Sequence, residues 1–262
     1  MKLLTLNCHS WQEDDQIEKI RYLAETIYER AYDVVALQEV SQHKDRGIIY
    51  DNIREDNFAH LLVEELKELG SNYSFIWDFS HYGYDVWEEG VAILSKHPIA
   101  EVESFYVSRS RSIHNWKSRK ILGGTIGIEG EEIAFYTCHT GWWSDEDEPF
   151  EYQGKELSAK LRNLNKRAFF MGDFNNDARA RGEGYDFLIK KKFIDTFTLA
   201  RSKDDGHTVL GDIAGWEGDY SRKRLDIIFT NKMTDVKSNR VIFNEENKKI
   251  ISDHFGVEVV TD

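Results

Sequence analysis

The chain has 262 residues, 40% of them hydrophobic and only two of them proline, which favours one α/β domain over residues 1–262. Its formal net charge of −13 argues against a nucleic-acid partner, because proteins that bind DNA or RNA usually present a basic surface. No apolar run is long enough to span a membrane or to form a signal segment, so a soluble, cytoplasmic protein is expected.

Apolar residues at helical spacing predict four helices, in chain order at residues 14–31, 57–69, 151–164 and 183–191. Asp14 or Asp15 is placed to cap the first helix. The apolar face of this helix is predicted to contain Ile17, Ile20, Ala24, Ile27, Tyr28 and Ala31. Shorter apolar runs predict strands near residues 2–8, 33–38, 73–78, 91–95, 100–107, 121–128, 132–139, 167–172, 225–230, 235–243 and 254–260. Many of these strands follow one another directly, as across the turn at Gly130, so hairpins and mixed sheets are expected.

Five polar, aromatic-rich segments separate these elements and are expected to be loops that build a pocket. They are residues 40–57, 78–90, 108–118, 140–151 and 202–222. One of them contains the acidic run Asp145–Glu148, which would repel a polyanionic strand and therefore favours a small phosphorylated ligand.

Side chains with catalytic or metal-binding chemistry stand at the ends of six apolar runs. In chain order they are Asn7, Glu39, His139, Asp173 with Asn175, Asp226, and Asp253 with His254. A buried carboxylate is unfavourable unless it is paired or bound to a metal, so six such positions are difficult to explain as solvated surface. The segment Gly172–Asn175 is the most informative, because it ends a buried strand and residues two apart in an extended chain point the same way.

This ordered set resembles the endonuclease/exonuclease/phosphatase superfamily, which includes deoxyribonucleases, abasic-site endonucleases, neutral sphingomyelinases and inositol polyphosphate 5-phosphatases. The resemblance extends from Asn7 to His254 and includes the strand and turn at residues 90–99. It implies a four-layer sandwich, with two facing mixed β-sheets flanked by outer helices and the site at one rim. Residues 5–11 and 138–143 are most similar to a bacterial branch that contains maltose 6'-phosphate phosphatases.

The metal site is predicted around Glu39, with Asn7 nearby, because Mg²⁺ (or Mn²⁺) prefers a few hard oxygen ligands and keeps several waters. Asp253 is interpreted either as a second metal contact or as a hydrogen-bonding group. Neither the identity of the metal nor the number of metal ions follows from the sequence.

The proton-transfer residues are predicted to be Asp173, Asp226 and His254. Asp226 and His254 should form a dyad in which the carboxylate fixes the imidazole tautomer. Either Asp173 or His254 is the base that activates water, and Asn175 should orient that water or stabilise the phosphoryl oxygens.

The substrate contacts are predicted from five positions. His139 should donate to a phosphoryl oxygen, and Glu89 is interpreted either as its orienting carboxylate or as a solvated acid of a loop. Arg119 is interpreted as a phosphate-binding guanidinium or, alternatively, as a surface salt bridge. Trp142 and Trp143 either contact a sugar ring or anchor a long loop in the core.

These assignments predict a metal-dependent phosphomonoesterase that acts on a sugar phosphate, and the resemblance points to maltose 6'-phosphate. A metal-dependent nuclease and a lipid phosphodiesterase are the alternatives within the superfamily. The net charge disfavours the nuclease, and the lack of a long apolar hairpin or amphipathic anchor disfavours the lipid enzyme. A non-catalytic regulatory protein would be expected to lack motif residues, and none is missing here. No obligate protein partner is indicated, and the oligomeric state stays open.

Overall fold

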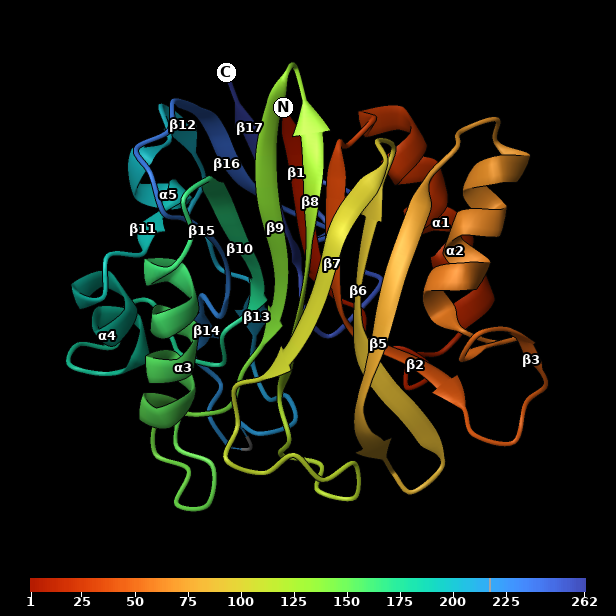
Figure 1. The fold of residues 1–262 in the computed structure, drawn as a ribbon, viewed down its shortest axis with the longest axis horizontal. Coiled ribbons are helices and arrows are strands. Elements are labelled where there is room, and N and C mark those ends of the chain that lie inside the picture. Colours follow the sequence, from red (N-terminus) through yellow and green to blue (C-terminus); the bar gives the residue numbers. More distant parts are fainter. Residues whose placement is uncertain (217) are drawn as a thin grey trace.

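The computed structural model describes residues 1–216 and 218–262, and its two large β-sheets face each other at the centre of the molecule (Figure 1). The first sheet has the order β12 (Ser202–Lys203), β16 (Val236–Ile242), β17 (Gly256–Thr261), β1 (Lys2–Asn7), β2 (Val34–His43), β6 (Trp87–Ser95) and β5 (Ser74–Gly83). The second has the order β11 (Ile194–Asp195), β15 (Asp226–Thr230), β10 (Arg167–Asp173), β9 (Glu131–His139), β8 (Lys120–Ile128) and β7 (Ile99–Tyr106).

Helices cover the outer face of each sheet. The first sheet carries α1 (Gln16–Arg30) and α2 (Phe58–Glu68), and the second carries α3 (Phe150–Arg162) and α4 (Gly184–Lys190) (Figure 1). A short helix α5 (Thr196–Leu199) lies between β11 and β12 in the chain. Two small hairpins complete the fold: β3 (Ile48–Tyr50) with β4 (Ile53–Arg54), and β13 (Val209–Leu210) with β14 (Arg222–Lys223).

Three hydrophobic layers hold these four structural layers together, because alternate residues of each strand point to opposite faces of its sheet. Ala36 in β2 and Phe135 in β9 point into the layer between the sheets. Their neighbours point outwards, so Leu37 packs beneath α1 and α2 while Tyr136 packs beneath α3. This arrangement confirms the predicted four-layer sandwich of two mixed sheets and outer helices.

The predicted elements match the observed ones closely at the helices and less closely in the region of β2, β5 and β6. All four helices are present within two residues of the predicted bounds. The loop predicted at residues 78–90 is wrong, because β5 continues to Gly83 and β6 begins at Trp87. The loop predicted from residue 40 is also wrong at its start, because β2 continues to His43. The turn at Gly130 is confirmed, with a φ of +85°.

The packing of α1 also differs from the prediction. The predicted face is confirmed at Ile20, Ala24 and Ile27, which are buried together with Leu23. It is wrong at Ile17 and Tyr28, which are 43% and 50% exposed. Asp15 precedes the helix in the left-handed conformation, with a φ of 53°, and its side chain caps no backbone N–H group. None of the described helices is both long and apolar enough to cross a membrane.

Candidate active site

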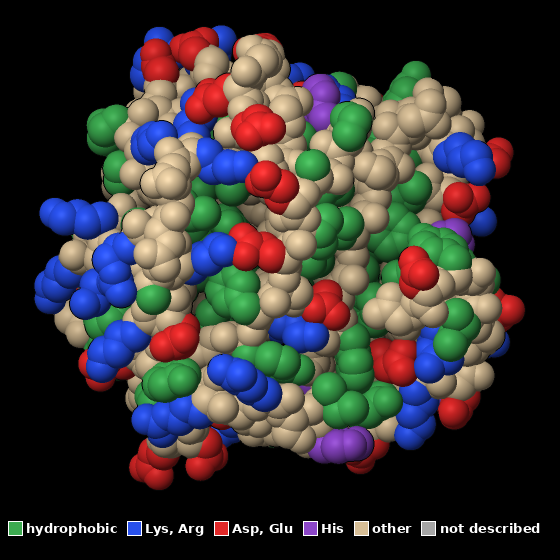
Figure 2. All heavy atoms as spheres, viewed as in Figure 1, with side chains coloured by type: hydrophobic (Ala, Val, Ile, Leu, Met, Phe, Trp, Pro, Cys, Tyr) green, Lys and Arg blue, Asp and Glu red, His purple; other side chains and the backbone are tan. Residues whose placement is uncertain are grey.

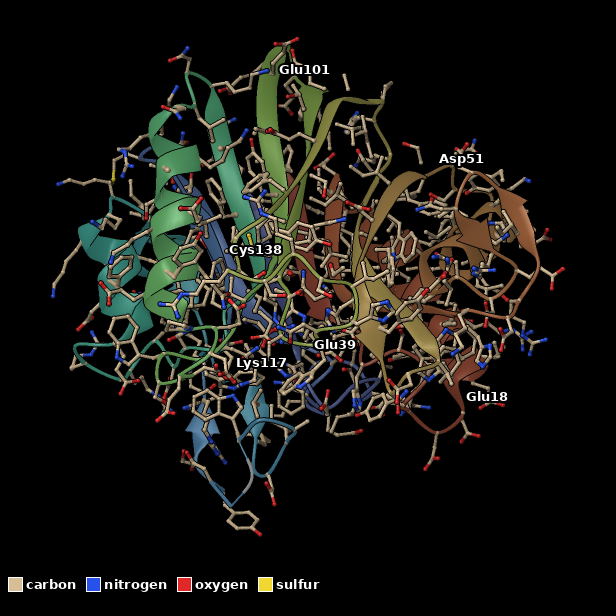
Figure 3. All side chains as sticks on the ribbon, turned by 60° about the horizontal axis from the view of Figure 1, so that its bottom comes forward. Glu18, Glu39, Asp51, Glu101, Lys117 and Cys138 are labelled. Atoms are coloured by element: carbon tan, nitrogen blue, oxygen red, sulfur yellow. The ribbon has the colours of Figure 1, made fainter. Side chains whose placement is uncertain are left out.

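The predicted motif residues converge at one edge of the paired sheets. Asn7 ends β1 beside Gln38 of the parallel strand β2. Asp173 ends β10 and lies opposite His139 of the parallel strand β9 and Asp226 of the antiparallel strand β15. Figure 3 turns this edge towards the viewer, with Glu39 near its centre. The topology therefore brings residues from both sheets to a common rim.

A β-bulge directs Glu39 into this rim. The pairing of β2 with β6 shifts register between Leu37 and Val40, and Glu39 has a φ of 51°. Bulges re-aim a side chain by inserting an unpaired residue into a strand. The Ser10 hydroxyl donates to the carbonyl oxygen of Glu39, and the Trp77 indole donates to the carbonyl oxygen of Val40 at 2.8 Å. These two hydrogen bonds hold the unusual backbone in place.

The segment Gly172–Asn175 has a different local geometry from the extended one predicted. A Cβ atom on Gly172 would lie 1.9 Å from the carbonyl oxygen of Cys138, and the φ of Gly172 is +151°, so only glycine fits there. Strand β10 ends at Asp173, and Asn175 has a φ of 48°. The two side chains still meet, because the Asn175 backbone N–H donates to Asp173 Oδ1 at 2.8 Å in a tight turn.

Asp173 is the centre of the buried polar cluster. Its Oδ2 accepts from the side-chain amides of Asn7 at 3.3 Å and of Asn175 at 3.2 Å. The Nε2 atoms of His139 and His254 each lie 3.8 Å from the same oxygen. Burial raises the pKa of Asp173 to about 6, with a further increase from the carboxylate of Asp226. A buried carboxylate with such partners is suited to proton exchange near neutral pH.

The two histidines of this cluster have opposite charge preferences. His254 Nδ1 lies 2.8 Å from Asp226 Oδ2, which gives the predicted dyad contact. Burial opposes a charge on His254, but the carboxylates of Asp226 and Asp173 outweigh it and raise the pKa well above its usual value. Burial, together with the positive charge of Arg119, lowers the pKa of His139 well below its usual value. The surroundings therefore favour the charged form of His254 and the neutral form of His139.

The donor set around Glu39 fits a divalent cation. Glu39 Oε1 accepts from the Asn7 amide at 2.8 Å and lies 3.8 Å from His139 Nε2. Burial, with the nearby negative charges of Glu89 and Asp253, raises the pKa of Glu39 to about 8. The carboxylates of these three residues repel one another in a half-buried site, and a bound Mg²⁺ or Mn²⁺ would offset that repulsion. Asn7 itself bridges Glu39 and Asp173 through its amide nitrogen in this arrangement.

Asp253 lines the same pocket, next to Ser252, whose hydroxyl donates to the carbonyl oxygen of Asn7 at 2.7 Å. The Oδ1 atom of Asp253 accepts from the Ser252 hydroxyl at 3.3 Å and lies 3.7 Å from His9 Nδ1. His9 is itself held by Glu13 at 2.7 Å, and its ring lines the pocket. The two interpretations of Asp253, as a metal contact or as a hydrogen-bonding group, are both compatible with this position.

The partner of Glu89 differs from the prediction. Glu89 Oε1 lies 3.3 Å from His81 Nε2, and no hydrogen bond or ion pair joins Glu89 to His139 in the described part of the chain. His81 Nδ1 lies 3.1 Å from the carbonyl oxygen of Ser118. Both nitrogens of His81 thus face oxygen acceptors, and Glu89 supports His81 rather than His139. Sequence reasoning missed His81 because it placed residues 78–90 in a loop, whereas His81 and Glu89 are register partners in β5 and β6.

Arg119 lies inside a pocket of about 1060 Å³ that opens over the polar cluster. Its side chain is only 4% exposed. Nη1 donates to the carbonyl oxygen of Trp116 at 2.7 Å, and Nε is buried without a hydrogen-bond partner among the described residues. The surface salt bridge considered from the sequence is therefore wrong, because Arg119 is buried and forms no ion pair with a described carboxylate.

The two adjacent tryptophans have different environments. Trp142 lines the pocket, with the Arg119 guanidinium 5.9 Å from its ring and the Trp116 ring 6.0 Å away. Trp143 also reaches the pocket, but its ring packs against Phe150 and Phe187 at 6.4 and 6.1 Å. The sugar-contact interpretation therefore fits Trp142, and the core-anchor interpretation fits Trp143.

Much of the acidic run at residues 145–148 has a structural role that local sequence does not reveal. Asp145 Oδ2 pairs with Lys117 Nζ at 2.7 Å. Glu148 is 4% exposed and accepts from the backbone N–H groups of Arg109 at 2.7 Å and Ser110 at 2.6 Å. These contacts join loop 108–118 to loop 140–149. Lys117 and Glu39, both labelled in Figure 3, line the same pocket.

Known proteins share this arrangement of sheets and helices. The sequence profile of the Endonuclease/Exonuclease/phosphatase family matches residues 4–254. A structure from Leptotrichia buccalis, described as an endonuclease/exonuclease/phosphatase family protein, has a TM-score of 0.93 and 42% identity, covering 100% of this chain and 99% of that one. No curated protein gave a significant match.

Two more distant structures share the fold. A mannosyl-6-phosphatase from Bacteroides thetaiotaomicron has a TM-score of 0.74 at 19% identity, covering 100% of this chain and 99% of that one. A 3' phosphatase from Neisseria, solved with a product DNA hairpin, has a TM-score of 0.66 at 16% identity with the same coverage. At these identities the likeness shows the fold alone.

Proposed function

The chain belongs to the endonuclease/exonuclease/phosphatase family, and from this premise we propose that it is a divalent-metal-dependent phosphomonoesterase acting on a small phosphorylated sugar. The observation that carries the proposal is the buried guanidinium of Arg119, which faces the pocket with an unpartnered Nε among the described residues. A planar guanidinium edge matches the oxygens of a terminal phosphate, and a dianionic phosphate would satisfy this buried donor.

The polar cluster supplies groups for hydrolysis at phosphorus. We assign the role of base to Asp173, because its buried carboxylate lies at the centre of the cluster and the carboxylates of Asp226 and Asp173 raise the pKa of His254, which favours the charged imidazolium. The charged His254, held by Asp226, stabilises negative charge beside Asp173. The three groups titrate together, so the pH dependence will describe the cluster rather than one residue.

His139 and Arg119 provide donors for the phosphoryl oxygens. A neutral His139 can donate one hydrogen bond from Nε2, which faces the region between Glu39 and Asp173. Glu39 would hold Mg²⁺ or Mn²⁺, with Asn7 and Asp253 nearby, and the bound ion would polarise the phosphate as a Lewis acid. Asn175 uses its amide nitrogen on Thr140 and Asp173, so its own contribution is to hold Asp173 in position.

The outer pocket favours a sugar over other phosphate esters. Aromatic faces pack against the apolar faces of sugar rings while hydroxyl groups bond at the edges. Trp142, Trp116 and Trp216 all line the pocket, and the ring of Trp142 lies 5.9 Å from the Arg119 guanidinium. A disaccharide phosphate such as maltose 6'-phosphate could place its phosphate on Arg119 and its second ring on this aromatic wall. The fold alone does not determine which phosphate ester is the substrate, since sugar phosphatase and DNA phosphatase structures are both similar to it.

The distribution of charge disfavours a nuclease. The net charge is −13, and on the face in Figure 2 the Lys and Arg side chains gather beside α3 and α4 at the left edge of the view. Elsewhere on that face basic and acidic side chains are mixed. A strand of DNA would need a continuous basic track to offset its phosphate charges.

A lipid phosphodiesterase is the second candidate, because the hairpin of β3 and β4 exposes three consecutive apolar side chains. Ile48, Ile49 and Tyr50 are 60%, 42% and 47% exposed. This small apolar hairpin was not expected from the sequence, which placed residues 40–57 in a polar loop. An exposed apolar group of this kind can contact a membrane surface, so a lipid substrate needs a direct test.

The deciding experiment is a substrate panel with Mg²⁺ and Mn²⁺ that compares sugar phosphates, an aryl phosphate, DNA and sphingomyelin vesicles. Release of inorganic phosphate from sugar phosphates is expected, and Arg119→Lys should raise KM for them about tenfold because the planar fork is lost. Arg111→Lys, at an exposed position of the same loop, is the matched control and should leave KM unchanged. Efficient cleavage of DNA or sphingomyelin without release of phosphate from any sugar phosphate would overturn the proposal.

A further inference from the structure

Trp216 connects the pocket wall to the polar cluster. Its indole N–H donates to Asn175 Oδ1 at 3.2 Å, and its ring lines the pocket. Asn175 is 4% exposed, and its Nδ2 donates to the carbonyl oxygen of Thr140 at 2.9 Å and to Asp173 Oδ2 at 3.2 Å. The indole is thus the donor that completes the hydrogen bonding of an amide whose other end contacts Asp173.

The buried ammonium group of Lys223 holds the segment that carries Trp216. Lys223 is 1% exposed, and its Nζ donates to the carbonyl oxygens of Asp219 at 3.1 Å and Ser221 at 3.2 Å. The same ammonium lies 5.1 Å from the centre of the Trp216 ring. A cation placed against an indole at this distance stabilises the pair, so the ring is held in a defined orientation.

The same segment also contacts Trp142, a second aromatic residue that lines the pocket. A Cβ atom on Gly215 would lie 2.2 Å from the Trp142 ring, so the backbone at Gly215 packs directly on that side chain. Gly215 has a φ of +83°, a conformation that other residues rarely adopt. The position of Trp216 is therefore fixed relative to Trp142 as well as to Asn175.

We propose that Trp216 is a positioning residue for hydrolysis, which orients the Asn175 amide and through it the Asp173 carboxylate. The inference rests on the proposed phosphoesterase function. It adds a hydrogen-bonded connection from Trp216, on the aromatic wall of the pocket, to the proposed base Asp173. Asp173 Oδ2 must point at the attacking water while it accepts from two amides. Loss of the indole N–H frees Asn175 Oδ1 and allows the amide to rotate away from Asp173.

The test is Trp216→Phe, which keeps an aromatic ring and removes the N–H. Its kcat should fall about 3- to 10-fold, the equivalent of one hydrogen bond, on an aryl phosphate and on a sugar phosphate alike, with KM for the aryl phosphate unchanged. In an Asn175→Ala background the same substitution should cause no additional loss, since Trp216 acts through Asn175. Asn175→Ser replaces Asn175→Ala if the latter does not fold.

Trp87→Phe is the matched control, because Trp87 stacks on Trp11 at 5.9 Å and does not line this pocket. It should leave kcat and KM at wild-type values. A loss confined to KM for the sugar phosphate would make Trp216 a binding residue only and overturn the inference. Fully multiplicative losses in the double variant would overturn it as well.

A measurement without turnover separates this inference from the proposed function. The indole N–H resonance of Trp216, identified by its disappearance in Trp216→Phe, should shift in Asn175→Ala and stay in place in Trp87→Phe. If the wild-type protein hydrolyses no phosphate ester, the proposed function fails while this resonance still reports on the contact. An indole resonance that does not respond to Asn175→Ala would refute the contact itself.

Discussion

Gln38 donates a hydrogen bond from Nε2 to Thr137 Oγ1 over 2.9 Å, and this bond joins the two facing sheets directly beneath the candidate site. Gln38 precedes Glu39 in β2, and Thr137 lies two residues before His139 in β9. Thr137 also donates to the carbonyl oxygen of Leu37 at 3.0 Å. A buried polar contact therefore helps to set the spacing between Glu39 on one sheet and His139 on the other.

Removal of the Thr137 hydroxyl should affect both stability and activity. Thr137→Val keeps the shape of the side chain but leaves the Gln38 amide without one of its acceptors, at a cost of about 1–3 kcal/mol in the free energy of unfolding. Urea unfolding and phosphatase kinetics measure the two effects. Thr261→Val is the control, because Thr261 is 2% exposed and its hydroxyl has no hydrogen-bond partner among the described residues. Equal effects of both variants would contradict the role of the inter-sheet bond.

Glu39→Gln should abolish the response of the protein to divalent cations. A ligand that binds only the folded state raises the unfolding temperature, so Mg²⁺ or Mn²⁺ should stabilise the wild-type protein in a thermal melt. The variant lacks the charged hard ligand, so both the melt shift and the activity should be lost. Glu146→Gln, at an exposed acid of loop 140–149, should retain both. If Mg²⁺ or Mn²⁺ raises the unfolding temperature of Glu39→Gln as much as that of the wild-type protein, the metal binds at other residues.

The metal-free protein should lose stability as the pH rises from about 5 to 8. The folded pKa of Glu39 is about 8, above its ordinary value of 4.5, so within this range the folded state binds a proton that the unfolded state has released. Stability therefore decreases with pH across that window, and Glu39→Gln removes this contribution. Urea titrations in chelator at about pH 5.5 and pH 8 measure it. A pH dependence identical in both proteins would mean that Glu39 ionises normally.

Asp173→Asn and His254→Ala should each reduce kcat by about 10²- to 10⁴-fold, the usual contribution of a positioned proton-transfer group. Because Asp173 Oδ2 lies 3.8 Å from His254 Nε2, the two act in one step and their losses should not multiply in the double variant. Single-turnover kinetics with an aryl phosphate would measure this. Independent, multiplicative losses would assign the two residues to different steps.

Local patterns in the sequence were sufficient to predict the apolar runs, whereas the four-layer arrangement was implied by the family resemblance. The strands β2, β5 and β6 extend beyond their predicted bounds. Apolar runs ending in Asn7, Asp173 and His139 indicated where polar groups would gather, and the structure brings them together. The alternation of inward and outward residues does not depend on distant contacts. The helical spacing was likewise strong enough to locate all four predicted helices.

The features that the sequence did not predict depend on pairing between distant strands. The bulge at Glu39 exists only because β2 pairs with β6, and the contact between His81 and Glu89 requires the register of β5 on β6. Trp216 reaches Asn175 across 41 residues of chain, which no local pattern records. The burial of Ile17 was overestimated because the tertiary packing of α1 buries Leu23 together with Ile20, Ala24 and Ile27 and leaves Ile17 at the edge of that face.

Trp142 and Trp143 provide the most direct test of the sugar pocket, because adjacent residues should respond in opposite ways. Trp142 lines the pocket, so Trp142→Ala should reduce kcat/KM for a disaccharide phosphate about tenfold or more and for an aryl phosphate much less, since sugar binding helps to position the phosphate. Trp143 packs against Phe150 and Phe187, so Trp143→Ala should instead destabilise the fold by about 3 kcal/mol.

Thermal melts and kinetics with both substrates distinguish the two outcomes. Trp142→Ala should melt close to wild type, since its ring is only partly buried and its indole N–H has no hydrogen-bond partner among the described residues. Trp143→Ala should melt at a lower temperature but, below that temperature, show a similar ratio of the two activities to that of the wild-type protein. If Trp142→Ala reduces both activities equally, the aromatic wall does not recognise the sugar, and the specificity of the enzyme must come from the phosphate end of the pocket.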